Sequence, residues 1–153
     1  MPRESKYRVD LSWQGDTTKD YDRSFSLTAP LKQAIQGSTD PVFKGDAAKW
    51  NPEEFLLAAV SSCHMLSYLH LAAKAGILVT EYTDSPTGVL TLAEGKGKMT
   101  KVTLNPVVKL TDISRLEEAK ELHGKAHEQC FIANSVSVPI QINPDVIVSI
   151  KAP

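Results

Sequence analysis

The stretch WNPEEFLLAAVSSCHMLSYLHLAAKAG, residues 50–76, carries the strongest helix signals of the chain. Asn51 is a good N-cap, Pro52 suits the first helical position, and the glutamates after it place negative charge at the positive end of the helix dipole. Gly76 is expected to end the helix in a left-handed conformation. Between these ends the residues are apolar almost all round, and such a helix must be buried. The sequence therefore predicts a central helix that the rest of the chain covers.

This run approaches a membrane span in length, but its polar residues argue for the core of a soluble protein. Glutamates open the helix and Lys74 closes it. Other residues interrupt the apolar run, among them Cys63, His64, Ser67, Tyr68 and His70. The longest uninterrupted apolar segment is therefore well short of the roughly 20 residues that a bilayer requires.

Length and charge restrict the classes of function. The chain has 153 residues, 42% of them hydrophobic and 23% charged, with a formal net charge of -1, which predicts one globular domain over residues 1–153. The near-neutral charge and the lack of a basic cluster argue against nucleic acid or an anionic membrane as the main partner. The N-terminus MPRESKYRVD has no apolar signal segment, so a cytoplasmic protein is expected. Two cysteines in such a chain indicate catalysis, redox exchange or metal binding, or have no special role.

Alternating apolar and polar residues predict strands on both sides of the central helix. The predicted strands cover residues 7–13, 23–28, 78–82, 89–93, 98–110, 136–142 and 146–150, with Pro106 bending the fifth. Residues 29–49 are predicted to form a long loop. A capping box of Ser114 and Glu117 is expected to open a second, amphipathic helix over residues 114–130, which ends at Cys130.

Two motifs, WNPEEFLLAAVSSCHMLSYLHLAAKAGI and HEQCFIANSV, resemble the two cysteine motifs of the OsmC/Ohr family of hydroperoxide-reducing peroxidases. The order and spacing of the predicted elements are similar as well. The segments SWQG and DPVFKGDAAKW resemble a less characterised OsmC-like branch. The resemblance implies an α+β fold with antiparallel sheets around a buried, cysteine-bearing central helix. It also implies an intertwined homodimer with two active sites at the subunit interface.

The resemblance also implies a role for each cysteine. Cys63 matches the peroxidatic cysteine, whose thiolate attacks the peroxide O–O bond and becomes a sulfenic acid. Cys130 matches the resolving cysteine, which condenses with the sulfenic acid to form a Cys63–Cys130 disulfide. An external dithiol then reduces the disulfide, and in the hydroperoxide resistance branch this reductant is a lipoylated protein. No cofactor is implied.

The family uses an arginine, held by a glutamate, to favour the thiolate and polarise the peroxide. The arginines of this chain are Arg3, Arg8, Arg23 and Arg115. Arg23 is the favoured candidate, partly by elimination, although it would also suit an exposed strand end. Glu53 matches the family position in NPE, and at about 100° per residue it lies roughly 80° from Cys63 around the helix. Since it lies about 15 Å away along the axis, it is expected to orient Arg23 or to act across a dimer interface, unless it only supplies charge to the helix N-terminus.

Two other classes of function stay open from the residues alone. The spacing of His123, His127 and Cys130 puts them on one helical face, and with Cys63 they could form a tetrahedral zinc site. A noncatalytic module that binds a small apolar or sulfur-containing ligand is the second alternative. His64 is turned about 100° from Cys63, so a packed or interface histidine is expected. The favoured function is reduction of organic hydroperoxides, with an apolar mouth formed by residues such as Phe25, Phe55 and Phe131.

Overall fold

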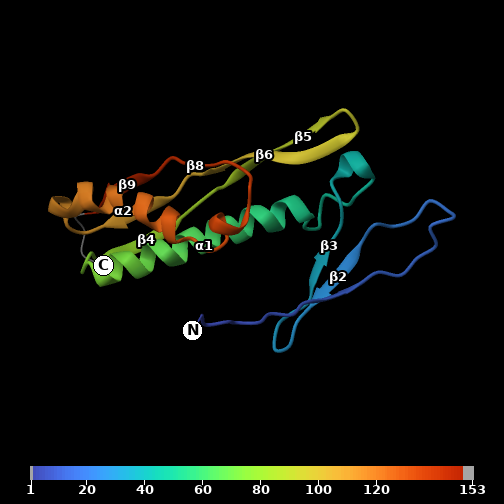
Figure 1. Cartoon of the computed structure of the whole chain (residues 1–153), viewed down its shortest axis with the longest axis horizontal. Helices are drawn as coiled ribbons and strands as arrows, with labels where there is room; N and C mark the ends of the chain where they lie inside the picture. Colours follow the sequence, from blue (N-terminus) through green and yellow to red (C-terminus); the bar gives the residue numbers. More distant parts are fainter. Residues whose placement is uncertain (1, 150–153) are drawn as a thin grey trace. The chain divides into compact units, whose positions relative to one another are not determined.

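A computed structural model describes residues 2–149 and divides the chain into two compact units, one ending at Phe55 and the other beginning at Leu56 (Figure 1). The strands are β1 Asp10–Ser12, β2 Phe25–Thr28, β3 Ile35–Gly37, β4 Val79–Thr83, β5 Thr87–Ala93, β6 Lys96–Leu104, β7 Val107–Leu110, β8 Ile140–Ile142 and β9 Asp145–Val148. The α-helices are α1 Pro52–Lys74 and α2 Leu116–Gln129, and short 3-10 helices cover Pro41–Phe43, Ile113–Arg115 and Ala133–Ser135. The single domain over residues 1–153 stays a prediction. Ile150, the predicted end of the last strand, lies outside the described residues.

The N-terminal unit is built on the antiparallel sheet β1-β2-β3. The predicted pairing of its first two strands is confirmed, although β1 is shorter than the alternating pattern indicated. The prediction of a loop throughout residues 29–49 is wrong, because β3 lies within it. Gly37 of β3 pairs with Phe25 of β2, and a Cβ at Gly37 would lie 2.3 Å from the Phe25 ring. The missing side chain therefore leaves room for that ring.

Helix α1 has the predicted bounds and the predicted ends. The Asn51 side chain accepts a hydrogen bond from the backbone N–H of Glu54 at 2.9 Å, and the Glu54 carboxylate accepts one from the N–H of Asn51 at 3.0 Å. This reciprocal pair satisfies two donors at the helix start. Gly76 follows the helix with φ of +71°, the left-handed conformation that the sequence predicts.

The burial of α1 differs from the prediction. Within the chain its fully buried residues lie along one face, namely Val60, His64, Tyr68, Leu71 and Ala72. Other apolar positions stay exposed, including Leu66. By length and composition α1 is the one helix in residues 2–149 that could cross a membrane, a test that core helices of soluble proteins also pass. The prediction of burial all round was wrong for the single chain, because α2 and the sheets cover only one side of α1.

The second unit contains two three-stranded sheets, ordered β4-β7-β9 and β5-β6-β8. Pro106, which has no N–H to donate, separates β6 from β7, and the chain changes sheet at this point as the predicted bend suggested. Strand β8 runs parallel to β6, and β9 runs parallel to β7. The sheets are therefore mixed rather than purely antiparallel, because both strands after α2 return in the direction of their neighbours.

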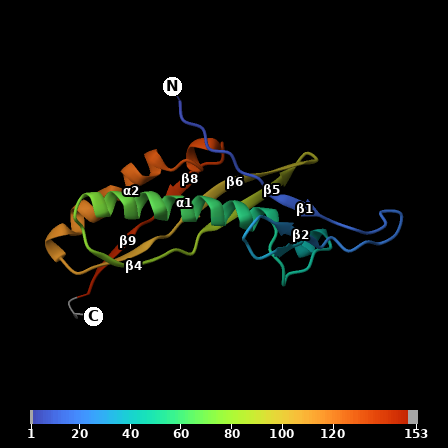
Figure 2. The same ribbon diagram turned by 90° about the horizontal axis from the view of Figure 1, so that it is seen from below.

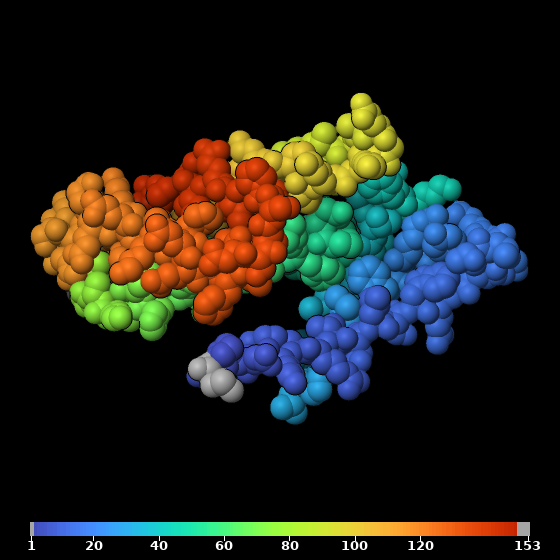
Figure 3. All heavy atoms as spheres, in the orientation of Figure 1, coloured from blue at the N-terminus to red at the C-terminus, as the bar shows by residue number. Residues whose placement is uncertain are grey.

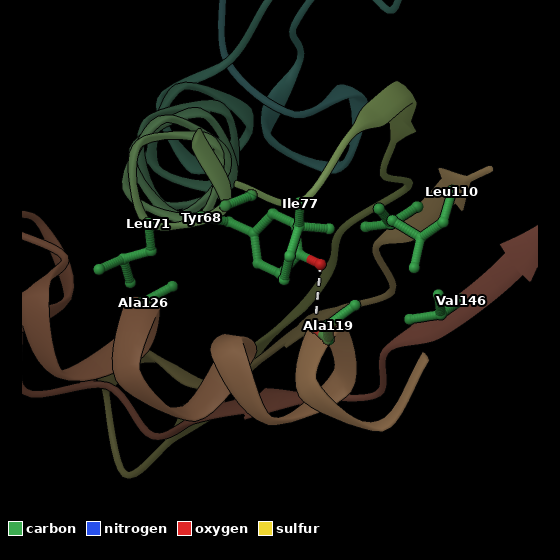
Figure 4. Packing of buried hydrophobic residues seen from close by; sticks show 9 residues of the cluster. Tyr68, Leu71, Ile77, Leu110, Ala119, Ala126 and Val146 are labelled. Atoms are coloured by element: carbon green, nitrogen blue, oxygen red, sulfur yellow. Dashed lines mark hydrogen bonds between the residues drawn. The ribbon is translucent and has the colours of Figure 1, made fainter. Parts of the chain in front are cut away.

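The core of this unit joins α1 to α2 and to the first of these sheets. In Figure 4, Tyr68, Leu71 and Ile77 meet the small residues Ala119 and Ala126 of α2. Strands β7 and β9 complete this cluster with Val108, Leu110 and Val146. A second cluster packs Val60 of α1 against β6 residues Val102 and Leu104. In Figures 1 and 2 the two helices lie side by side, and the space-filling view shows the segment from α2 onward packed against α1 (Figure 3).

The start of α2 corrects one prediction. Ser114 was expected to cap the helix, but Asp112 takes that part in the preceding turn, where its carboxylate accepts hydrogen bonds from both the backbone N–H and the hydroxyl of Ser114, at 2.9 and 2.6 Å. The 3-10 helix Ile113–Arg115 therefore comes first, and α2 begins at Leu116. Aspartate is as good a cap as serine, and here it lies at the earlier position.

Candidate active site

The two cysteines of the chain come together between the helices of the second unit. Cys63 lies in the middle of α1 and is half-buried, whereas Cys130 directly follows α2 and is buried. The backbone N–H of Cys130 donates to the carbonyl of His127 at 3.3 Å, which ends the helix at this residue. The Cys130 sulfur accepts the N–H of Ala133 at 3.4 Å. Both cysteines are free thiols.

The surroundings of Cys130 raise the pKa of its thiol. Burial is the main cause that raises the pKa of Cys130, and the neighbouring Cys63 thiol raises it further, both as a hydrogen-bond partner and through charge. The N–H groups of Ala133 and Ile132 act in the opposite direction. Cys130 is therefore held as a neutral thiol beside Cys63.

Cys63 opens onto a cavity of about 830 Å³. Most of the cavity surface is apolar, and its lining includes Leu66, Ser67, His70, Phe131 and Ile132 beside the thiol. Phe131, predicted to form part of an apolar mouth, is in this lining. The other two predicted mouth residues, Phe25 and Phe55, belong to the N-terminal unit, and their part in the mouth stays a prediction.

Arg23, the predicted thiolate-activating residue, immediately precedes Ser24 and strand β2 in the N-terminal unit. Its guanidinium lies 4.1 Å from the centre of the Tyr21 ring and donates to the Tyr21 carbonyl at 2.6 Å. The Asp20 carboxylate lies 3.7 Å away. With 22% of its side chain exposed, Arg23 is held by its neighbours rather than extended into solvent. Its action on Cys63 stays a prediction.

Glu53, the predicted partner of Arg23, lies in the first turn of α1 and is half-buried. Its neighbour Glu54 is committed to the helix cap. Glu53 is therefore the carboxylate of this turn that the cap does not use, and its orientation of Arg23 stays a prediction.

The predicted zinc ligands do not converge in the described part of the chain. The His123 Nδ1 atom lies 3.0 Å from Nε2 of His64, so this imidazole is committed to another histidine. In residues 2–149 no group of three or more histidine, cysteine, aspartate or glutamate side chains is arranged to hold a metal ion. The regular i, i+4, i+7 spacing on α2 reflects a shared helical face.

The buried pair of His64 and His123 is the feature of this region that the sequence did not predict. Both imidazoles are almost completely buried, and their rings lie nearly parallel, at 10°, with centroids 5.3 Å apart. The expectation of a packed His64 is confirmed, but its partner lies 59 positions further along the chain. No local pattern connects positions that far apart, so only the packing of α2 on α1 reveals the pair.

Comparison with known proteins identifies the family to which this chain belongs. Residues 44–145 match the model of the family described as OsmC-like protein. An OsmC-like protein of unknown function from Vibrio cholerae is 33% identical, with 92% of this chain and 99% of that chain aligned and a TM-score of 0.83. The chain belongs to the OsmC-like family. No curated protein matches the sequence.

More distant structures share the fold. An organic hydroperoxide resistance protein from Elizabethkingia anophelis is 18% identical, aligned over 96% of this chain and 100% of that one, with a TM-score of 0.69. Another, from Legionella pneumophila, is 20% identical over 95% of this chain and 100% of that one, with a TM-score of 0.66. The predicted family and the α+β fold are thereby confirmed.

Proposed function

We propose that this protein is a cofactor-free, two-cysteine peroxidase that reduces organic hydroperoxides. The observation that carries the proposal is the meeting of a half-buried Cys63, which opens onto an apolar cavity, with a buried Cys130 thiol of raised pKa. Two solved structures that share the fold are named organic hydroperoxide resistance proteins, which supports the substrate class.

The cycle begins at Cys63, the thiol that faces the cavity. Its thiolate attacks one peroxide oxygen, so that an S–O bond forms as the O–O bond breaks. The alkoxide that leaves takes up a proton and becomes an alcohol. Cys63 is then a sulfenic acid and has been oxidised by two electrons, which the peroxide has gained.

Cys130 completes the oxidative half of the cycle. Its sulfur attacks the Cys63 sulfenic acid, an S–S bond forms, the S–O bond breaks, and water leaves with the proton of the Cys130 thiol. An external dithiol reduces the disulfide and becomes a disulfide itself. A lipoylated protein is the proposed reductant, as in the hydroperoxide resistance branch of the family.

Arg23 and Glu53 complete the proposed site. A guanidinium near the Cys63 sulfur favours the thiolate and polarises the peroxide, which offsets the tendency of burial to keep a thiol neutral. The Glu53 carboxylate would orient this guanidinium. A homodimer is proposed as the assembled form, and the exposed apolar residues Tyr7, Val9 and Leu11 supply surface for a second copy to cover.

Mass spectrometry of the reduced protein after one equivalent of cumene hydroperoxide tests the proposed cycle. We expect wild type to lose about 2 Da, with Cys63 and Cys130 joined in one peptide pair. The Cys130→Ser variant should instead gain one oxygen on Cys63, trapped as a sulfenic acid. A native spectrum of the same sample reports whether the protein is a dimer. Wild type that neither consumes hydroperoxide nor forms the bridge would rule out the peroxidase, and retained ligand affinity in a variant lacking both cysteines would favour a binding module.

The apolar cavity predicts a preference for organic hydroperoxides. We expect kcat/KM for cumene hydroperoxide to exceed that for hydrogen peroxide at least about tenfold, because an apolar substituent gains roughly 1–3 kcal/mol on leaving water. Leu66→Ser should lower kcat/KM for cumene hydroperoxide while leaving that for hydrogen peroxide within about twofold. Leu78→Ser is the matched control, since Leu78 is similarly exposed, 59% against 62%, and does not line the cavity. Equal efficiencies for the two peroxides would contradict this preference.

A further inference from the structure

His64 and His123 form a closed pair in the core of the second unit. Their facing nitrogens, Nε2 of His64 and Nδ1 of His123, lie 3.0 Å apart, and 1% and 3% of the two residues is exposed. The His123 ring also stacks on Tyr68, with centroids 4.1 Å apart. One imidazole N–H donates a hydrogen bond to the other ring, so the pair directly links α1 to α2.

This link is one of a series of polar contacts between the two helices. At the start of α2, Arg115 Nη2 donates to the carbonyl of Ala75 at 2.8 Å. One turn into α2, the carbonyl of Ala119 accepts a hydrogen bond from the Tyr68 hydroxyl at 2.9 Å, drawn as a dashed line in Figure 4. The histidine pair follows one turn later. As the residue number rises along α2 it falls along α1, so the helices run antiparallel and the histidine pair lies nearest to the cysteines.

Filling the core with the histidine pair carries a cost in folding free energy, because it buries polar atoms that lack partners. The other nitrogens, His64 Nδ1 and His123 Nε2, are buried without a hydrogen-bond partner in the described residues. Two apolar side chains of similar size would fill the same space without leaving buried polar atoms unpaired. The imidazoles instead supply a directional contact. A hydrogen bond restricts the position of α2 along α1 more narrowly than apolar contact does.

We propose that the His64–His123 pair positions the two cysteines by fixing the register of α2 against α1. His64 directly follows Cys63, and Cys130 follows His123 by about two helical turns. A slip of one residue along a helix moves the chain by about 1.5 Å. A disulfide tolerates Cα separations only from about 4.4 to 6.8 Å, so a slip of that size consumes much of the permitted range. Neither histidine lines the cavity at Cys63, so the role is positioning and not contact with substrate.

The effective molarity of the two thiols, measured by equilibration with oxidised and reduced glutathione, tests this role. In that reaction the two protein thiols become a disulfide while one oxidised glutathione is reduced to two thiols, so electrons and protons balance. We expect His123→Leu to lower the effective molarity about tenfold or more, since the thiols lose their fixed approach. The matched control is Arg115→Gln, which removes the polar contact at the far end of α2 and should leave the effective molarity within about twofold of wild type.

A variant that restores the hydrogen bond distinguishes a positioning role of the pair from general destabilisation of the fold. In the double variant His64→Gln with His123→Asn, amide groups replace Nε2 and Nδ1 and can form a neutral hydrogen bond between the same positions. This variant should recover effective molarity to within about threefold of wild type. If His123→Leu does not fold, the effective molarity of the double variant relative to wild type still tests the positioning role.

Two outcomes would overturn the positioning role: equal losses of effective molarity in His123→Leu and Arg115→Gln, or a rescue variant no better than His123→Leu. The inference rests on the pairing of Cys63 with Cys130 in the proposed function, but glutathione exchange requires no hydroperoxide. A protein that is inert toward hydroperoxide and yet shows a high, histidine-dependent effective molarity would refute the peroxidase and retain the positioning pair.

Discussion

Replacement of Cys63 by serine is expected to lower the rate of hydroperoxide reduction at least about a thousandfold, because a serine hydroxyl supplies no thiolate near neutral pH. The rate is measured by stopped flow with cumene hydroperoxide, and turnover is followed with dihydrolipoamide as the reductant. Cys130→Ser should keep the first reaction with peroxide and lose disulfide-dependent turnover. This contrast follows from the position of Cys63 at the cavity and of Cys130 behind it.

The same assay tests whether Arg23 takes part in the reaction of Cys63 with peroxide. Arg23→Met should slow the reaction of Cys63 about 10- to 100-fold, since a positive charge near the developing alkoxide stabilises the transition state. Arg8→Met is the matched control, because Arg8 pairs with Asp10 on an exposed strand with 79% of its side chain in solvent. Circular dichroism establishes that each variant is folded. A Cys63→Ser protein that keeps a tenth of the wild-type rate would refute the thiol mechanism, and equal rates for the two arginine variants would exclude Arg23.

Local signals in the sequence predicted local structure well. The ends of α1 depend on Asn51 and Gly76, which act within a few residues of themselves, and the structure places both as expected. The bond from the Asn51 N–H to the Glu54 carboxylate was not predicted. The prediction that Ser114 caps α2 was wrong, because Asp112 and Ser114 both suit an N-cap and nothing nearby decides between them. Predictions of where a helix begins are therefore limited where neighbouring residues suit the N-cap equally well.

Contacts between distant segments were predicted only where a resemblance supplied them. The prediction of a Cys63–Cys130 disulfide came from two family motifs and not from spacing. The link of His64 to His123 had no such motif and was missed. Strand direction was missed in the same way, since the alternation in β8 and β9 is the same whether a neighbouring strand runs parallel or antiparallel.

The buried histidines make the folded protein sensitive to acid. Burial lowers the pKa of both His64 and His123 from 6.5 to about 4. Electrostatic interaction with His127 lowers the pKa of His64 further, whereas Asp84 acts in the opposite direction. His64 in turn lowers the pKa of His123. Between pH 6.5 and 4 the unfolded chain therefore binds protons that the folded chain does not, and stability falls as the pH falls through this window.

We expect the free energy of unfolding to fall by about 2–4 kcal/mol between pH 7 and pH 5 through these two residues. Urea unfolding followed by circular dichroism measures the loss, because the helices of the second unit dominate that signal. The double variant His64→Gln with His123→Asn contains no imidazole at either position and should show a loss smaller by that amount, while His70→Gln, which changes an exposed histidine, should behave as wild type. Equal acid losses in wild type and the double variant would mean that the pair accepts protons in the folded state. The expected loss of stability below pH 6.5 is thus the consequence of burying two neutral imidazoles between α1 and α2.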